Sequence, residues 1–178
     1  AAGNAAIAGG GIKFKTDPML LKIVSGGQTG VERSALDAAL ERNFACGGWC
    51  PRGRRAEDGQ IPMRYPLREL DSGKYLDRTH RNVADADGTL ILSRGTLTGG
   101  TKATAQFARK IGKPLLAIDF HGAEADTTVA QIGEWIATGR IEILNVAGPR
   151  ESSIPGVQHE TSRLIRAVLD GLSPRSPS

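Results

Sequence analysis

The sequence predicts a single α/β domain with a parallel β-sheet and helices on both of its faces. Short apolar runs alternate with helical patterns along the chain, and this rhythm is typical of strands joined by crossover helices. Two of the runs are followed by a glycine-rich turn and an alanine-rich helix. The 178 residues, 39% hydrophobic and 24% charged, suit one core of ordinary size. Together these observations favour a Rossmann-like domain.

Five apolar runs are predicted to be the strands of this sheet. They lie near Leu20–Val24, Phe44–Gly47, Thr89–Leu92, Leu115–Ile118 and Glu142–Val146. We expect the domain to span residues 19–172. Residues 1–18 are rich in Gly and Ala without periodicity and are predicted to be a flexible extension, and residues 173–178 a disordered tail.

The helical patterns show which faces should be buried. The helix after the first turn has a stripe of Val31, Ala35, Ala38 and Ala39. The helix after the second turn is predicted to bury Ala103, Phe107 and Ile111. It should end at Gly112, because glycine favours a C-terminal cap and Pro114 cannot continue a helix.

The first glycine-rich turn, Leu20–Gly30, reads LLKIVSGGQTG. The first N–H groups of a helix lack intrahelical partners and carry the positive end of its dipole, so such a turn predicts an anion site. Ser25-x-Gly27-x-x-Gly30 is the dinucleotide fingerprint with serine in place of its first glycine. The acidic residue expected about 20 positions later is absent, which disfavours nicotinamide dehydrogenases.

The second turn, Leu90–Gly100, reads LILSRGTLTGG and offers N–H groups, hydroxyls and the guanidinium of Arg94. Neither turn ends in the Gly-Lys-Ser/Thr of a P-loop, which disfavours NTPases of that class. Arg150 follows the fifth predicted strand, at the edge where open α/β sheets bind ligands. Two anion sites on one sheet predict a polyphosphorylated or nucleotide-like ligand.

The segment Pro51–Asp71 is a long irregular excursion after the second strand, and we expect it to be functional. Its arginines include Arg52, Arg54 and Arg55, each either a ligand contact or a solvated surface residue. Nearby Trp49 and Tyr65 are expected to order the segment. Whether Trp49 stacks on a ligand ring or fills the core stays open.

Several functions are disfavoured by composition. The net charge is +4, but only 4% of residues are aromatic and no nucleic-acid motif occurs. No apolar run approaches the length of a membrane span or signal peptide, so we expect a soluble, cytoplasmic protein. Cys46 and Cys50 form neither a disulfide framework nor a zinc motif. The three histidines show no triad or metal spacing, so we predict neither a metal site nor nucleophilic catalysis.

Several motifs, read in order, resemble the molybdenum-carrier family. They are KIVSGGQTGVERSALDAAL, GGWCPRGRRAEDG, YPLRE, GTLILSRGTLTGGTKATAQFARKIGKP and ILNVAGPRES, and the match spans about Leu21 to Leu172. This family belongs to a Rossmann-like nucleotide-binding superfamily that includes the "lonely guy" phosphoribohydrolases and the lysine decarboxylase-like proteins.

The resemblance implies a ligand across the strand ends. Its contacts would come from the first loop, the second loop and cationic side chains: Gly26, Gly27, Gln28, Thr29, Gly30, Thr98, Gly99, Gly100, Thr101, Arg33 and the Arg52–Arg55 segment. It also implies that molybdenum cofactor is the cargo, held without a metal ligand from the protein. Molybdoenzymes that receive the cofactor and further copies of the chain are the expected partners.

Two alternatives remain. In the phosphoribohydrolase relatives a catalytic glutamate stands where this chain has Gln106. An amide cannot act as a general base, so we expect binding without hydrolysis and no catalytic residue. The other alternative is a domain that senses an NAD-derived or cyclic nucleotide.

Overall fold

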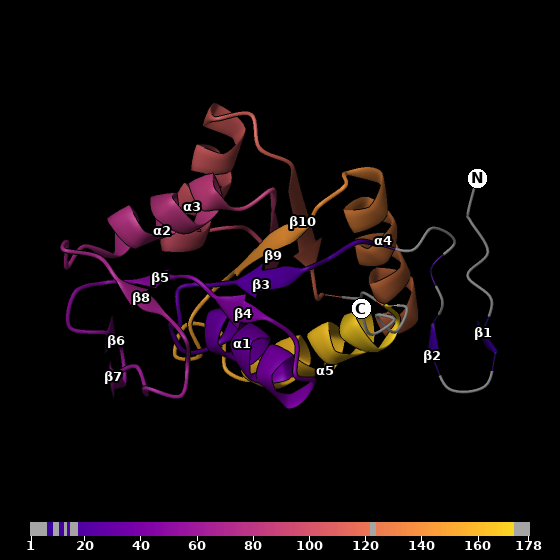
Figure 1. Ribbon diagram of the computed structural model, residues 1–178, viewed down its shortest axis with the longest axis horizontal. Helices are drawn as coiled ribbons and strands as arrows, with labels where there is room; N and C mark the ends of the chain where they lie inside the picture. The colour runs from indigo at the N-terminus through magenta and orange to yellow at the C-terminus, as the bar shows by residue number, and fades with distance from the viewer. Residues whose placement is uncertain (1–6, 9–10, 13, 15–17, 122–123, 173–178) are drawn as a thin grey trace, which may run out of the picture.

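The central sheet has five strands among the residues that the structure describes, all parallel to their neighbours (Figure 1). The computed structural model describes residues 7–8, 11–12, 14, 18–121 and 124–172. The order across the sheet is β10 (Leu115–Asp119), β9 (Gly88–Ser93), β11 (Ile143–Ala147), β3 (Lys22–Val24) and β4 (Cys46–Gly47). The five predicted strands are therefore confirmed, with ends that differ by one or two residues.

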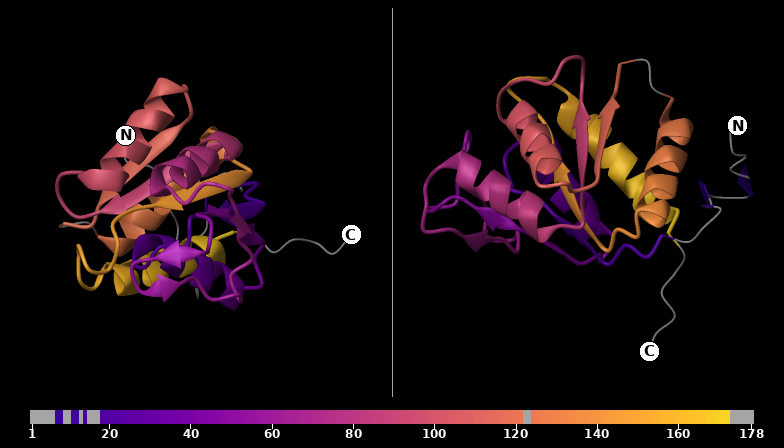
Figure 2. Two further views of the ribbon diagram at one scale, coloured as in Figure 1. Left: turned by 90° about the vertical axis from the view of Figure 1, so that its left-hand side faces the viewer. Right: turned by 90° about the horizontal axis from the view of Figure 1, so that it is seen from above.

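In the described part of the chain, five helices cover the sheet, and they lie on both of its faces as predicted (Figures 1 and 2). On one face lie α1 (Val31–Glu41), α4 (Ala125–Thr138) and α5 (Val157–Asp170). On the other lie α2 (Tyr75–Asp85) and α3 (Gly99–Lys110). The strand β9 is buried along its whole length, because it lies inside the sheet between these two layers. The helix α2 was not predicted from the sequence.

The buried stripe of α1 is confirmed, since Val31, Ala35, Ala38 and Ala39 are fully buried in the main core. The end of α3 is also confirmed, because Gly112 adopts a positive φ of 70° directly after it.

The predicted face of α3 is wrong. Its buried residues are Thr101, Thr104, Ala105 and Ala108. Phe107 instead stacks on His80 of α2, with ring centroids 3.9 Å apart, and Ile111 is 39% exposed. Small side chains thus face the sheet, while the aromatic ring packs against the neighbouring helix.

The excursion after the second strand has more structure than predicted. β5 (Trp49–Cys50) pairs with β8 (Arg68–Glu69), and β6 (Arg55–Ala56) forms a hairpin with β7 (Gly59–Gln60). These strands surround a second small core made of Leu36, Cys50, Ile61, Tyr65 and Leu67. Tyr65 therefore orders the segment, as expected.

At the N-terminal end, β1 (Ile7–Ala8) pairs with β2 (Gly11–Ile12), and Phe14 packs against the main core. The predicted flexible extension and disordered tail fall largely on residues outside the described part of the chain. Among the described residues, no helix has the length and apolar character required to cross a membrane.

Candidate anion-binding site

A cleft with a volume of about 670 Å³ lies at the carboxyl ends of the sheet strands. Its walls come from the start of α2, the start of α3, the β3–α1 loop and the β11–α5 loop. The strands β9 and β11 are neighbours, but the helices that follow them, α3 and α5, cover opposite faces. Such a divergence opens a crevice beside the strand ends, where ligands of α/β sheets bind.

The amino end of α3 is open toward this cleft. Thr98, Gly99, Gly100 and Thr101 line the cleft, and Thr98 precedes the helix in an extended conformation. The N–H groups of the first three helical residues, from Gly99 to Thr101, have no acceptor among the described residues. The first turn of α3 also has no acidic side chain. An anion would therefore meet three free donors and the positive end of a helix dipole.

The β3–α1 loop is occupied by the protein's own groups. The carboxylate of Glu32 accepts a hydrogen bond from the N–H of Gln28 at 3.0 Å. The Gln28 side-chain oxygen accepts from the N–H of Thr29 at 3.0 Å, and the carbonyl of Pro149 accepts from Val31 at 3.2 Å. The anion at the start of α1 is thus an internal carboxylate.

Glu32 is neutralised by Arg78 of α2. The Nη1 atom of Arg78 lies 2.6 Å from Oε1 of Glu32, and both side chains are buried. The guanidinium fills the space beside Gly26, where an added Cβ would lie 1.7 Å from Nη1. The absence of a side chain at Gly26 therefore lets α2 reach the loop.

Two residues that line the cleft each have a buried donor without an acceptor. Gln28 and Arg78 are 5% and 6% exposed, and both line the cleft. Among the described residues, neither Nε2 of Gln28 nor Nε of Arg78, both buried atoms, has a hydrogen-bond partner. Buried polar atoms without partners are costly, so a ligand acceptor at this position would remove an energetic penalty.

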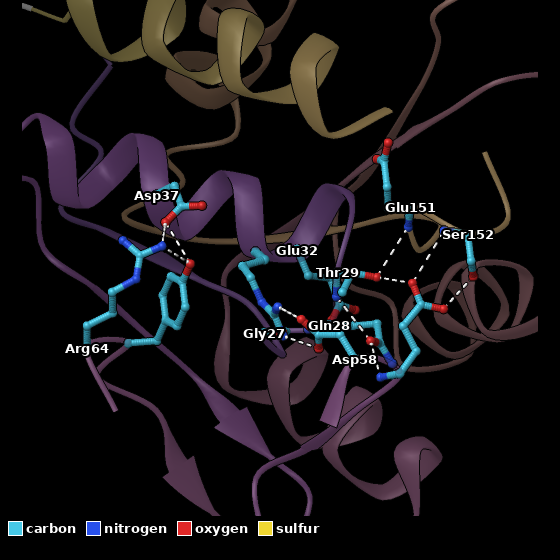
Figure 3. Close-up of polar contacts among 12 residues, drawn as sticks. Gly27, Gln28, Thr29, Glu32, Asp37, Asp58, Arg64, Glu151 and Ser152 are labelled. Atoms are coloured by element: carbon cyan, nitrogen blue, oxygen red, sulfur yellow. Dashed lines mark hydrogen bonds and ion pairs between the residues drawn. The ribbon is translucent and has the colours of Figure 1, made fainter. Parts of the chain in front are cut away.

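The β6–β7 hairpin fastens the loops beside the cleft (Figure 3). Glu57 accepts hydrogen bonds from the hydroxyls of Thr29 and Ser152, and Arg33 pairs with Asp58. Burial opposes ionisation of Glu57, but these hydrogen bonds outweigh it and lower its pKa. The hydrogen bond from Arg33 likewise lowers the pKa of Asp58. A neighbouring cavity of about 710 Å³ is lined by Thr29, Arg33, Glu57 and Asp58, among others.

Of the residues predicted for the site, some line the cleft and others do not. Gln28, Thr98, Gly99, Gly100, Thr101 and Arg150 line it. Gly26, Gly27 and Gly30 pack against Arg78, Leu67 and Pro149, respectively. Thr29 and Arg33 line the neighbouring cavity instead.

The remaining predicted arginines lie elsewhere. Arg54 is buried and donates to the carbonyls of Ile61, Pro62, Tyr65 and Leu67, which gives it a structural role. Arg52 and Arg55 are exposed, and Arg94 pairs with Glu160.

Sequence reasoning missed the contribution of α2 to the cleft. Tyr75, Arg78 and Thr79 line it from that helix. Their spacing of three and four residues places them on one helical face, which could have indicated the helix.

Trp49 lies outside the cleft lining, and its indole N–H donates to Asp85 at 2.8 Å. Among the described residues, no group of three or more His, Cys, Asp or Glu side chains could hold a metal ion.

The fold and the cleft define a Rossmann-like α/β protein with an open cleft at its strand ends. The model of cpYpsA, the circularly permutated YpsA SLOG family, matches residues 23–169, and the chain belongs to this family. A crystal structure from Syntrophus aciditrophicus SB, of a protein named "Putative molybdenum carrier protein", is similar to it. The two share 42% identity and a TM-score of 0.84 over 86% of this chain and 97% of that one. A search of curated proteins finds no match.

Proposed function

We propose that the chain binds a phosphorylated, nucleotide-like molecule in this cleft without hydrolysing it, and that it acts as a carrier of molybdenum cofactor. The observation that carries the binding proposal is the pair of buried, unpartnered donors, Nε2 of Gln28 and Nε of Arg78. Gln28 and Arg78 line the same cleft as the first residues of α3, whose N–H groups are free. A phosphate or metal-oxo group has several strong acceptors and could satisfy donors from both walls.

The choice of cargo is supported by the relative from Syntrophus aciditrophicus and its name. Molybdenum cofactor carries both a phosphate and a metal-oxo group on the pyran ring that is fused to its pterin. Both groups are anionic, which suits a cleft with donors from more than one element. Transfer of the cargo to molybdoenzymes would make those enzymes partners of the chain.

The non-hydrolytic part of the proposal is supported by Gln106. This amide stands where the phosphoribohydrolase relatives have a catalytic glutamate, and it is exposed on α3 outside the cleft lining. We expect no release of ribose phosphate from AMP, and clear turnover would contradict this part.

The test of binding replaces one atom. Gln28→Glu keeps the oxygen that accepts from Thr29 and Glu57, but it replaces the free donor with a second carboxylate oxygen. We expect the affinity for orthophosphate and AMP, measured by calorimetry, to fall at least about tenfold, because a carboxylate repels an anion. The control is Gln131→Glu, the same change on the exposed surface of α4. Equal affinities in both variants would contradict the proposed site.

The cargo is tested on protein purified gently under reducing conditions. Native mass spectrometry, molybdenum analysis and pterin fluorescence after oxidation would be measured on the same sample. We expect a molybdenum-bearing pterin in the wild type and much less in Gln28→Glu. Purine nucleotides without molybdenum would support the cleft but contradict the carrier.

A further inference from the structure

At the rim of the cleft, positive charge gathers around the ring of Tyr75. Tyr75, Arg78 and Arg150 line the cleft, and Arg55 lies beside Tyr75 just outside that lining. The guanidinium carbons of Arg55, Arg78 and Arg150 lie 5.6, 6.0 and 6.0 Å from the ring centroid of Tyr75. Distances of up to about 6 Å are typical of cation–π contacts. The three arginines come from β6, α2 and the β11–α5 loop, so the fold brings together segments that are far apart in the sequence.

The charges at this rim are only partly balanced. Arg78 is paired with Glu32, and Arg150 lies 3.7 Å from the carboxylate of Glu57. Arg55 is exposed, and no carboxylate of the described residues forms an ion pair with it. One guanidinium charge of the three therefore lacks a counter-ion at the mouth of the cleft.

In the proposed function, the inner part of the cleft binds one anionic group. The free N–H groups of α3, Nε2 of Gln28 and Nε of Arg78 would be the donors for that group. The β3–α1 loop cannot offer a second place of the same kind, because the carboxylate of Glu32 occupies it. A second anion would instead find Arg55 and Arg150 beside Tyr75.

We propose that Arg55, Arg150 and Tyr75 form a rim subsite, so that the preferred ligand of the cleft carries two anionic groups. This inference rests on the proposed function, since it assumes that the inner subsite binds the first group. The ligand class is then a diphosphate or another molecule with two oxyanions, rather than a phosphate monoester. Arg55 is the residue whose free charge selects for the second group.

The test compares inorganic anions, which contain no base or pterin. Orthophosphate, pyrophosphate and tripolyphosphate are titrated calorimetrically into the full chain at constant ionic strength. We expect the wild type to bind tripolyphosphate at least about tenfold more tightly than orthophosphate, because it can reach both subsites. In Arg55→Gln this preference should fall at least about threefold, while the affinity for orthophosphate stays within about twofold.

Arg68→Gln is the matched control. Arg68 is also exposed and also lies over an aromatic ring, with its guanidinium carbon 5.1 Å from the centroid of Trp49. Trp49 lies outside the cleft lining, whereas Tyr75, the ring beside Arg55, is part of it. Arg68→Gln removes the same charge from the protein as Arg55→Gln. Its effect on the affinities therefore measures the long-range attraction of highly charged anions. We expect it to keep the preference of the wild type.

The outcomes separate the two proposals. The rim subsite is refuted if orthophosphate binds in a Gln28-dependent way but Arg55→Gln and Arg68→Gln show equal preferences. Absence of orthophosphate binding, with Gln28→Glu without effect on any of the three anions, overturns the proposed function, and the rim subsite with it.

Discussion

The two glycine-rich loops have similar sequence patterns, but the N–H donors of one are bonded within the protein and those of the other have no acceptor among the described residues. At the β3–α1 loop, Glu32 in the first helical turn reaches back and binds the N–H of Gln28. At the β9–α3 loop the first helical turn has no acidic residue, and its N–H groups face the cleft. A glycine-rich strand-to-helix turn therefore provides donors, but the side chains of the next few residues decide whether an external anion can use them.

The largest effect is expected when the counter-ion of Glu32, whose carboxylate occupies the β3–α1 loop, is removed. Arg78→Met leaves the Glu32 carboxylate buried without its cation, so we expect the free energy of unfolding to fall by about 3–5 kcal/mol. The measurement is urea denaturation followed by circular dichroism. Arg81→Met on the same helix is the control, because its ion pair with Asp85 is about half exposed and should contribute less than about 1 kcal/mol. Similar losses in both variants would contradict an essential internal ion pair.

A smaller effect is expected from changing one glycine in each loop. Gly30 has φ 80° and ψ −130°, and an added Cβ would lie 2.4 Å from the carbonyl oxygen of Pro149. Gly30→Ala should therefore cost about 3 kcal/mol, because backbone strain and a clash combine. Gly99 has φ 50° with nothing near an added Cβ, so Gly99→Ala should cost only about 1–2 kcal/mol. Thermal unfolding of both variants measures the difference, and equal costs would show that the loops are equally tolerant.

The smallest effect is expected from lowering the pH. It should first weaken the β6–β7 hairpin, whose carboxylates hold the β3–α1 loop. The pKa values of Glu57 and Asp58 lie below their ordinary values of 4.5 and 3.8. Their stabilising contacts are thus fully present above those ordinary values and are lost as the pH falls through the lowered pKa values. Hydrogen exchange between pH 6 and pH 3 should show the β6–β7 hairpin losing protection below about pH 4.5, before the hydrogen-bonded later turns of α3 do. In Glu57→Gln this pH dependence should be weaker, and an unchanged profile would contradict the assignment.

The sheet could be predicted from the sequence because its strands are buried and apolar. The run Thr89–Leu92 is apolar because β9 is covered on both faces. The two glycine-rich turns directly follow β3 and β9, so they mark the carboxyl edge of the sheet, where the cleft lies. The cleft at that edge could therefore be anticipated in outline.

The helix α2 could not be predicted from apolar periodicity, because its buried face is mostly polar. The residues it buries are Arg78, Asn82 and Val83. Arg78 is paired with Glu32, and Asn82 bonds to the backbone of Trp49, so specific partners replace hydrophobic contacts. The occupation of the β3–α1 loop was missed for a related reason: sequence shows that Glu32 is near the loop, but not that its carboxylate turns back toward Gln28.

The position of β11 has a consequence for the order of folding during synthesis. It is the last strand of the sheet in the chain, yet it separates β9 from β3. Until residues 143–147 have left the ribosome, the β3–β4 and β9–β10 pairs share no strand and remain two unconnected ribbons. The cleft is then completed only after residues 143–147 have emerged, when the nascent chain inserts β11 between the two pairs.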